Sequence, residues 1–400
     1  MFPDVIVVGG GIIGCSCAYY LSRERLRVQL VERGALGSGT SKAGQCHIML
    51  WELPEINIRL AQASKQLYEA LSEEALVDIE YRRTGSLAIV EEPESMGDFG
   101  CTIRSLRDLG LGCQLLDNEE LRELEPNVAP DIAGGAYFPD DAQVNPLMVT
   151  WGLAQGAAQQ GAVIRTSTEA TGIDLSPDGS QVVAVNTTEG TVPTGSVVNA
   201  AGPWSASVGE MAGLDIPVVP RRGHLVVTEP VEDSIVRTKV LLAAGYIDSL
   251  KAGSSIGVAA NVQQTLKGSL VLGSSREFVG FDRSVSPQVI SLMLRRCVRL
   301  FPGLTGIHAI RMWAGLRPYS PDLVPIIGTA GSPEGFYVAT GHEGLGVTTG
   351  PITGKLISQL VTGQEPAVPV EQLSPLRFGS YVGSPRGVDS LVLPHDEGGS

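Results

Sequence analysis

A glycine loop near the start of the chain carries the residue pattern of a nucleotide site. The apolar segment 5–8 runs into Gly9-Gly10-Gly11-Ile12-Ile13-Gly14, an apolar helix follows, and Glu32 ends the next apolar strand. Glycines spaced in this way allow a tight turn and close backbone approach to a pyrophosphate, which the helix N-terminus attracts. A carboxylate at position 32 accepts hydrogen bonds from ribose hydroxyls and disfavours a 2′-phosphate. The pattern therefore predicts a site for FAD or NAD rather than NADP.

Two further loops rich in small residues follow predicted strands. Residues 34–45 come directly after the strand that ends at Glu32, and Asn199-Ala200-Ala201-Gly202-Pro203-Trp204-Ser205 follows the apolar strand 196–198. Ligands of parallel sheets bind at loops beyond the carboxyl ends of the strands. We therefore expect both loops to contact the nucleotide, although the second also fits a simple strand-to-helix corner.

Composition indicates a globular chain of two domains. Its 400 residues exceed what one hydrophobic core usually supports, and 43% of them are hydrophobic and 18% charged. A net charge of -14 argues against nucleic acid and anionic membrane surfaces as partners. We expect no membrane span, because no uncharged apolar run reaches the roughly 18 residues that a span requires.

The cysteines and the N-terminal residues indicate in which cellular compartment the protein is expected. The six cysteines, at positions 15, 17, 46, 101, 113 and 297, form no CxxC pair. The sequence therefore predicts reduced thiols, no zinc site and no iron–sulfur cluster within the chain. No basic segment, apolar segment and cleavage site precede the first strand. We expect a cytoplasmic protein without a metal.

Alternating strand and helix signals predict an α/β (α+β) fold with two domains, both discontinuous in sequence. A Rossmann-like nucleotide-binding domain is expected over residues 1–80, 145–214 and 316–378. A second domain, built on a mixed or antiparallel sheet and binding the substrate, is expected over residues 81–144 and 215–315.

Three segments outside the glycine loops receive specific predictions. Residues 94–126 are expected to form helices broken at glycines, and residues 182–188 and 191–198 to form a hairpin. The segment 379–400 is rich in Gly, Ser and Pro, so we expect a flexible tail or a contact with a partner.

The order of the motifs resembles the D-amino-acid oxidase family of FAD enzymes over about residues 4–378. The motifs are the glycine loop, Glu32, Gly39-Thr40-Ser41, Asn199-Ala200-Ala201-Gly202, Trp313-Ala314-Gly315-Leu316-Arg317-Pro318 and Gly341-His342-Glu343-Gly344-Leu345-Gly346. Within this family the chain is similar to glycine oxidase, to the β subunits of D-hydroxyproline, proline and opine dehydrogenases, and to a hydrogen cyanide synthase subunit. The resemblance implies FAD rather than NAD, and hydride transfer from the carbon beside an amine to flavin N5.

The resemblance also implies a set of cofactor contacts. These are Gly9, Gly11, Ile12, Ile13, Gly14, Glu32, Arg33, Gly39, Thr40, Ser41, Gly44, Gln45, Ala200, Ala201, Gly202, Trp204, Gly315, Arg317, Gly341, His342, Gly344, Leu345 and Gly346. The last loop opens an apolar helix, whose N-terminus would face the N1/O2 edge of the flavin.

Four residues are implied in catalysis. Arg317 would bind the substrate carboxylate through two parallel bonds, and Tyr246 would place its hydroxyl on the same carboxylate or would be a core tyrosine. His342 would act at the site or would be a hydrogen-bonded structural histidine. Glu343 stands where glycine oxidase carries an aromatic residue; it would face a substrate ammonium or hydroxyl, or would be solvated.

Three more residues lie near the implied flavin. Arg276 corresponds to a position over the flavin face, where some relatives carry a lysine that promotes reaction with oxygen. The absence of a lysine at this position favours a dehydrogenase. Cys46 and His47 lie near the flavin loop, but they do not match known positions of covalent attachment, so we expect them to pack in the core.

The resulting prediction is FAD-dependent oxidation of a small amino acid or secondary amine acid to the imine. D-hydroxyproline, proline, opine or glycine types fit. The chain would act as the β subunit of a dehydrogenase, with a partner flavoprotein or iron–sulfur subunit; a second flavin at the subunit interface stays open. The alternatives are a stand-alone oxygen-using oxidase, an NAD-linked dehydrogenase, and a non-catalytic subunit that passes electrons.

Overall fold

The glycine loop follows the first strand of the chain, which lies inside a six-stranded sheet. The computed structural model describes residues 2–231, 234–242 and 257–379. The sheet has the order β18-β19-β12-β1-β2-β8 and comprises β1 (Val5–Val8), β2 (Val28–Val31), β8 (Val163–Arg165), β12 (Val197–Asn199), β18 (Ile326–Thr329) and β19 (Phe336–Thr340). All neighbours are parallel except β18 and β19. Strand β1 is buried along its length, as its unbroken apolar sequence predicts.

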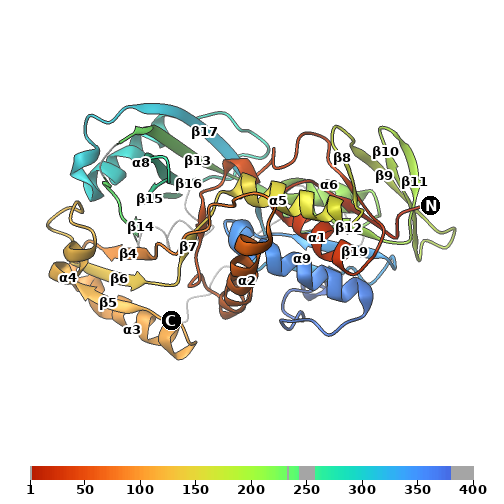
Figure 1. Ribbon diagram of the computed structural model, residues 1–400, viewed down its shortest axis with the longest axis horizontal. Helices are drawn as coiled ribbons and strands as arrows, with labels where there is room; N and C mark the ends of the chain where they lie inside the picture. Colours follow the sequence, from red (N-terminus) through yellow and green to blue (C-terminus); the bar gives the residue numbers. More distant parts are fainter. Residues whose placement is uncertain (1, 232–233, 243–256, 380–400) are drawn as a thin grey trace, which may run out of the picture.

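Helices cover this sheet, and α1 packs between α5 and α9 (Figure 1). The helices of this part are α1 (Ile12–Arg23), α2 (Glu55–Glu74), α5 (Pro146–Gln159), α6 (Ser205–Glu210) and α9 (Gly346–Thr362). Helices α1 and α9 approach so closely that a Cβ on Gly354 would lie 2.4 Å from the backbone carbon and oxygen of Ser16.

An eight-stranded mixed sheet lies at the other end of the molecule (Figure 1). Its order is β17-β13-β16-β15-β14-β4-β6-β5, with β4 (Ser86–Val90), β5 (Gln114–Asp117), β6 (Gly134–Phe138), β13 (Val219–Pro230), β14 (Lys239–Leu242), β15 (Gly257–Gln264), β16 (Ser269–Arg276) and β17 (Ala309–Tyr319). Only β14 and β4 pair in parallel. The helices that accompany it are α3 (Met96–Asp108), α4 (Asn118–Leu124) and α8 (Pro287–Leu300). The predicted fold class is confirmed, and the domain limits given above stay predictions.

Two smaller sheets complete the described part. They are β9 (Ala170–Leu175), β10 (Val182–Thr187) and β11 (Gly190–Pro193), and the pair β3 (His47–Ile48) and β7 (Ala142–Gln143). The predicted hairpin is therefore only partly right. Its second strand ends at Pro193, and residues 197–199 join the large sheet as β12.

The prediction of helices alone over residues 94–126 is wrong at one point. Strand β5 separates α3 from α4 and pairs with β6 at the edge of the eight-stranded sheet. The chain reverses at Gly110, where φ is +83°, and the exposed pattern of β5 gives little apolar alternation for sequence reasoning to detect.

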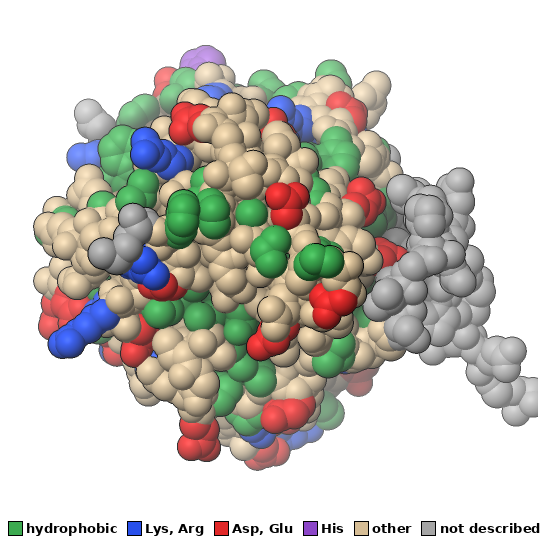
Figure 2. All heavy atoms as spheres, turned by 90° about the vertical axis from the view of Figure 1, so that its right-hand side faces the viewer, with side chains coloured by type: hydrophobic (Ala, Val, Ile, Leu, Met, Phe, Trp, Pro, Cys, Tyr) green, Lys and Arg blue, Asp and Glu red, His purple; other side chains and the backbone are tan. Residues whose placement is uncertain are grey.

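On the face shown in Figure 2, acidic, basic and hydrophobic side chains are interspersed, and charges of one sign do not gather into a single patch. Among the described residues, no helix combines the length and apolar character needed to cross a bilayer. The same residues contain no group of three His, Cys, Asp or Glu side chains suited to a metal ion.

Because α1 and α9 are in close contact, we expect a single added methyl group between them to destabilise the fold. Replacing Gly354 by Ala should lower the free energy of unfolding by about 1–3 kcal/mol, because the backbone of Ser16 cannot yield as a flexible side chain would. Gly97→Ala in α3 is the matched control, since its Cβ would meet nothing within 4 Å. Urea unfolding followed by circular dichroism measures both; equal stability of the two variants would contradict the close contact.

Candidate active site

One large cavity, of about 790 Å³, opens at the carboxyl ends of the parallel strands. Val8, Glu32, Ala200 and Thr340 line it from the ends of β1, β2, β12 and β19. Strands β13, β16 and β17 of the eight-stranded sheet supply another part of the lining. The cavity is therefore bounded by both sheets, and its volume is in the range of natural ligand and cofactor sites.

Most of the predicted site residues line this cavity. They are Gly9, Gly11, Ile12, Ile13, Glu32, Arg33, Gly39, Thr40, Ser41, Gly44, Gln45, Ala200, Ala201, Gly202, Trp204, Gly315, Arg317, His342, Glu343, Gly344 and Gly346. Gly14, Gly341 and Leu345 lie outside the lining, and Tyr246 lies outside the described residues.

The glycine loop is shaped by close backbone approach. Gly9 has φ +112°, and a Cβ there would lie 2.4 Å from the carbonyl oxygen of Ala200. A Cβ on Gly14 would lie 1.9 Å from the carbonyl oxygen of Gly9, so Gly14 lets α1 begin against the turn. The backbone N–H of Ile12, at the start of α1, donates to Ser41 Oγ at 2.9 Å. The loop thus presents backbone and a helix N-terminus to the cavity.

Two backbone hydrogen bonds hold the Glu32 carboxylate at the glycine-loop end of the cavity. Its Oε2 accepts from the N–H of Gly10 and its Oε1 from the N–H of Gly34, both at 2.7 Å. Each carboxylate oxygen has a second lone pair, which suits a hydroxyl donor in the cavity. The open glycine cradle, the helix N-terminus and this carboxylate fit a dinucleotide.

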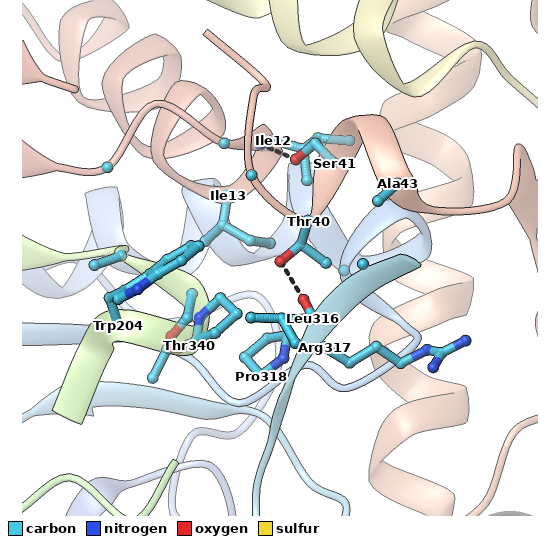
Figure 3. A pocket seen from close by; sticks show the side chains of 18 of the residues that line it. Ile12, Ile13, Thr40, Ser41, Ala43, Trp204, Leu316, Arg317, Pro318 and Thr340 are labelled. Atoms are coloured by element: carbon cyan, nitrogen blue, oxygen red, sulfur yellow. Dashed lines mark hydrogen bonds between the residues drawn. The ribbon is translucent and has the colours of Figure 1, made fainter. Parts of the chain in front are cut away.

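The loop after β2 joins the two sheets. Thr40 Oγ1 donates to the carbonyl oxygen of Leu316 on β17 at 2.6 Å (Figure 3). A Cβ on Gly315 would lie 2.4 Å from the Cβ of Ala43, so this loop packs directly on the strand. Figure 3 shows Trp204 at one end of the cavity and the side chain of Arg317 extending toward the other.

Arg317 is positioned by a backbone oxygen and by a glycine. Its Nη1 donates to the carbonyl oxygen of Ser275 at 2.9 Å. A Cβ on Gly223 of β13 would lie 2.0 Å from that same nitrogen, so only glycine leaves room for the guanidinium. Sequence reasoning missed Gly223, because no motif marks it and its role appears only when β13 pairs with β17.

Glu343 is buried among arginines. Its Oε1 lies 3.1 Å from Arg276 Nε, 3.7 Å from Arg221 Nη1 and 3.9 Å from Arg317 Nε. Burial by itself would raise the pKa of Glu343, but these guanidiniums outweigh it and lower the pKa to about 2. The solvated alternative is therefore wrong, and the carboxylate faces guanidiniums within the described part of the site. Its backbone has φ +45°, a conformation that glycine adopts more easily.

Arg221, which the sequence did not single out, lies behind the cavity wall. Its guanidinium carbon lies 5.0 Å from the ring centre of Phe278 and 5.1 Å from that of Tyr319. Burial lowers the pKa of Arg221 to about 10, against the opposing effect of Glu343. The guanidinium therefore stays charged near neutral pH, between the carboxylate and the two rings.

His342 fits the structural interpretation. Its Nε2 lies 2.9 Å from Thr353 Oγ1 of α9, and its side chain is buried. Burial lowers the pKa of His342 to about 3, so the ring is neutral at physiological pH. The ring ties the 341–346 loop to the helix that follows it.

Cys46 and His47 differ in their surroundings. Burial raises the pKa of the Cys46 thiol to about 11, so the sulfur is an unreactive thiol near neutral pH. His47 instead lines the cavity, which corrects the expectation that it packs in the core. Asn261, also missed by sequence reasoning, donates to Gln45 Oε1 at 2.7 Å and lines the cavity beside it.

Replacing Glu343 by Gln should lower the free energy of unfolding at pH 7 by about 3–5 kcal/mol, because buried guanidiniums lose their carboxylate. The lowered pKa means that this stabilisation is complete above about pH 4.5 and is lost as the pH falls toward about 2. Chemical unfolding at pH 7 and pH 3 should therefore show a smaller gap between wild type and variant at pH 3. The exposed Glu94, changed to Gln, serves as the control, and a gap that stays constant with pH would contradict the assignment.

Comparison with known proteins agrees with a dinucleotide cofactor in this cavity. The model of the DAO family, described as FAD dependent oxidoreductase, matches residues 4–360. The chain is 32% identical to glycine oxidase from Geobacillus kaustophilus, covering 95% of this chain and 97% of that protein. It is 29% identical to hydrogen cyanide synthase subunit HcnC from Pseudomonas aeruginosa, covering 96% and 98%.

Solved structures agree with these similarities. L-proline dehydrogenase from P. horikoshii has a TM-score of 0.87 at 25% identity and covers 94% of this chain and 98% of its own. Glycine oxidase from Geobacillus kaustophilus has a TM-score of 0.84 at 30% identity, with the same coverage. The family match spans both the glycine loop and the Arg317 segment. The chain belongs to the DAO family of FAD-dependent oxidoreductases, enzymes that oxidise amino acids or amines.

Proposed function

We propose that this chain oxidises a small amino acid or a secondary amine acid to the imine as the flavin subunit of a dehydrogenase complex. The substrate is of glycine, proline, D-hydroxyproline or opine type. Bound FAD supplies the hydride acceptor at flavin N5. The residues of the chain bind and orient the substrate against it.

The position of Arg317 is the observation that carries the proposal. Its guanidinium lines the cavity and is anchored on Ser275, so its plane is fixed before a substrate arrives. A planar guanidinium binds a carboxylate through two parallel charge-assisted hydrogen bonds. An amino acid held in this way has its α-carbon at a fixed distance from the anchoring arginine.

The N-terminus of α9 supports the redox step. Gly344, Gly346 and Val347 line the cavity there, and the first turn of the helix has no acidic residue. The positive end of the helix dipole stabilises negative charge, which develops at the N1/O2 edge of a flavin when it is reduced.

The relatives support the substrate class and the subunit role. Two of them are named for glycine and L-proline, and a third is named as a subunit of hydrogen cyanide synthase. A partner flavoprotein or iron–sulfur subunit would then accept the electrons, with or without a second flavin at the interface. A stand-alone oxygen-using oxidase is the second candidate, favoured by the 32% identity to a glycine oxidase.

Anaerobic titration of the purified flavoprotein tests the proposal. The substrates are glycine, sarcosine, D-proline, D-hydroxyproline, L-proline and an opine, and flavin absorbance is the readout. Bleaching by one of them followed by slow recovery in air supports the dehydrogenase subunit. Fast recovery in air supports the oxidase instead, and absence of bleaching by all six counts against amine oxidation by this chain alone.

Arg317→Ala should lower kcat/KM for that substrate by about 10- to 150-fold, mainly by raising KM, because a hydrogen bond to a charged group contributes about 1.5–3 kcal/mol. Arg317→Lys retains the charge without the planar fork and should recover only part of the loss. Arg59→Ala, which removes a surface arginine paired with Glu55, is the control. Flavin content and melting temperature must match the wild type, and an unchanged KM in Arg317→Ala would overturn the role.

A further inference from the structure

Two carboxamide side chains on the cavity wall each have a buried polar atom without a partner. Asn261 Nδ2 donates to Gln45 Oε1 at 2.7 Å, and both residues line the cavity. Among the described residues, Gln45 Nε2 and Asn261 Oδ1 have no hydrogen-bond partner, although both atoms are buried. Buried polar atoms in proteins nearly always have partners, so we expect a ligand in the cavity to complete this pair.

The eight-stranded sheet holds this carboxamide pair in place. Asn261 of β15 lies opposite Gly273 of β16 in the strand register. A Cβ on Gly273 would lie 2.9 Å from Gln45 Nε2, so glycine leaves the room over this strand that the Gln45 carboxamide fills. Gln263, two residues further along β15, donates from Nε2 to the carbonyl oxygen of Cys46 at 3.3 Å and so fixes the backbone next to Gln45. The two carboxamides are therefore positioned before a ligand arrives.

The carboxamide pair lies close to the arginine that the proposed function assigns to the substrate carboxylate. Arg317 Nη1 donates to the carbonyl oxygen of Ser275, and Ser275 is two residues from Gly273 on β16. Consecutive Cα atoms are about 3.8 Å apart, so these two strand positions lie within about 8 Å of each other. One small molecule in the cavity can therefore contact the guanidinium with one group and the carboxamides with another.

The two unpaired atoms determine which chemical group satisfies both. Gln45 offers an N–H donor and Asn261 an acceptor oxygen; turning both carboxamides over exchanges these roles but still leaves one of each. A carboxylate only accepts and an ammonium only donates, so either would leave one carboxamide atom unpaired. A methylene group would leave both unpaired. A hydroxyl group accepts one hydrogen bond and donates another, and it therefore completes the pair.

We propose that Gln45 and Asn261 bind a hydroxyl on the β or γ carbon of the substrate, while Arg317 binds its carboxylate. This inference rests on the proposed function and narrows its substrate class to hydroxylated amino acids or secondary amine acids, hydroxyproline rather than proline. Gln45 Nε2 donates to the hydroxyl oxygen, and the hydroxyl donates to Asn261 Oδ1. An analogue without the hydroxyl occupies the same space but leaves both carboxamide atoms unpaired, so the site discriminates against it.

The carbonyl and N–H edge of a flavin ring also presents one acceptor and one donor, and it is the alternative occupant. Strand β16 favours the substrate, because the same strand holds Arg317 through Ser275 and makes room for Gln45 at Gly273. The variant described below separates the two occupants.

Substrate discrimination by the wild type is the first test. The flavoprotein is reduced anaerobically by 4-hydroxyproline and by proline of the same hand, with serine and alanine as a second matched pair. In the pair that bleaches the flavin, the hydroxylated member should be favoured about 10²- to 10⁴-fold in the ratio of reduction rate to dissociation constant, because the other member leaves two buried polar atoms unpaired. Equal values for both members overturn the proposal.

The double variant Gln45→Met/Asn261→Leu removes the polar atoms and keeps the approximate size of both side chains. Its preference for the hydroxylated member should fall to about one or reverse, while reduction by the other member is retained. Gln155→Met, on the exposed face of α5, is the control. The proposal is overturned if the preference survives in the double variant, or if that variant binds FAD more weakly and keeps the preference, as a contact to the flavin edge requires.

Binding without turnover separates failure of the hydroxyl site from failure of the proposed function. 3-Hydroxybutyrate and butyrate differ only in a β-hydroxyl and carry no amine, so their dissociation constants are measured from the flavin absorbance of the wild-type holoprotein. 3-Hydroxybutyrate should bind at least about tenfold more tightly, and equal binding overturns the hydroxyl site. If no amine bleaches the flavin, the proposed function fails, whereas tighter binding of the hydroxy acid still supports a hydroxyl site at Gln45 and Asn261.

Discussion

The pairing register of β13 with β17 is the constraint on which the site depends. It sets Gly223 opposite Gly315 and Arg221 opposite Arg317. Gly223 leaves the space that the guanidinium of Arg317 fills, and Gly315 leaves the space into which Ala43 packs. A slip of one residue would turn the side chains of a strand to the other face of the sheet. The wall that carries the arginines and the loop beside the glycine cradle are therefore fixed by the same ladder.

The charges of the site are arranged around this frame rather than along one element. Arg221, Arg276 and Arg317 come from three adjacent strands, and Glu343 reaches them from the loop before α9. Buried charges are tolerated only when they are paired or hydrogen-bonded, so each of these groups constrains the others. The loop from the six-stranded sheet is thereby held against the eight-stranded sheet by charge as well as by packing.

The sequence predicts which residues gather at the glycine-loop end of the cavity better than it predicts the contacts at the Arg317 end. The residues at the glycine-loop end belong to short segments, in which sequence spacing alone indicates the local geometry. They are Gly9, Glu32 and the loops after β2 and β12. The surroundings of Glu343 could not be predicted, because its partners lie far apart in sequence and meet only through strand order. Strand β5 was missed for a related reason: its apolar pattern is weak and its position depends on pairing with β6. Tyr246 stays a prediction, since it lies outside the described residues.

The backbone at Glu343 has a consequence for related sequences. A residue other than glycine at φ +45° costs about 1–3 kcal/mol, and the loop already uses glycine at positions 341 and 344. Glycine would relieve that strain, so a glutamate is retained only where the attraction of the surrounding guanidiniums exceeds it. Positions 221, 276 and 343 should therefore change together during evolution: a relative that loses the carboxylate is expected to have lost or redirected one of the arginines as well.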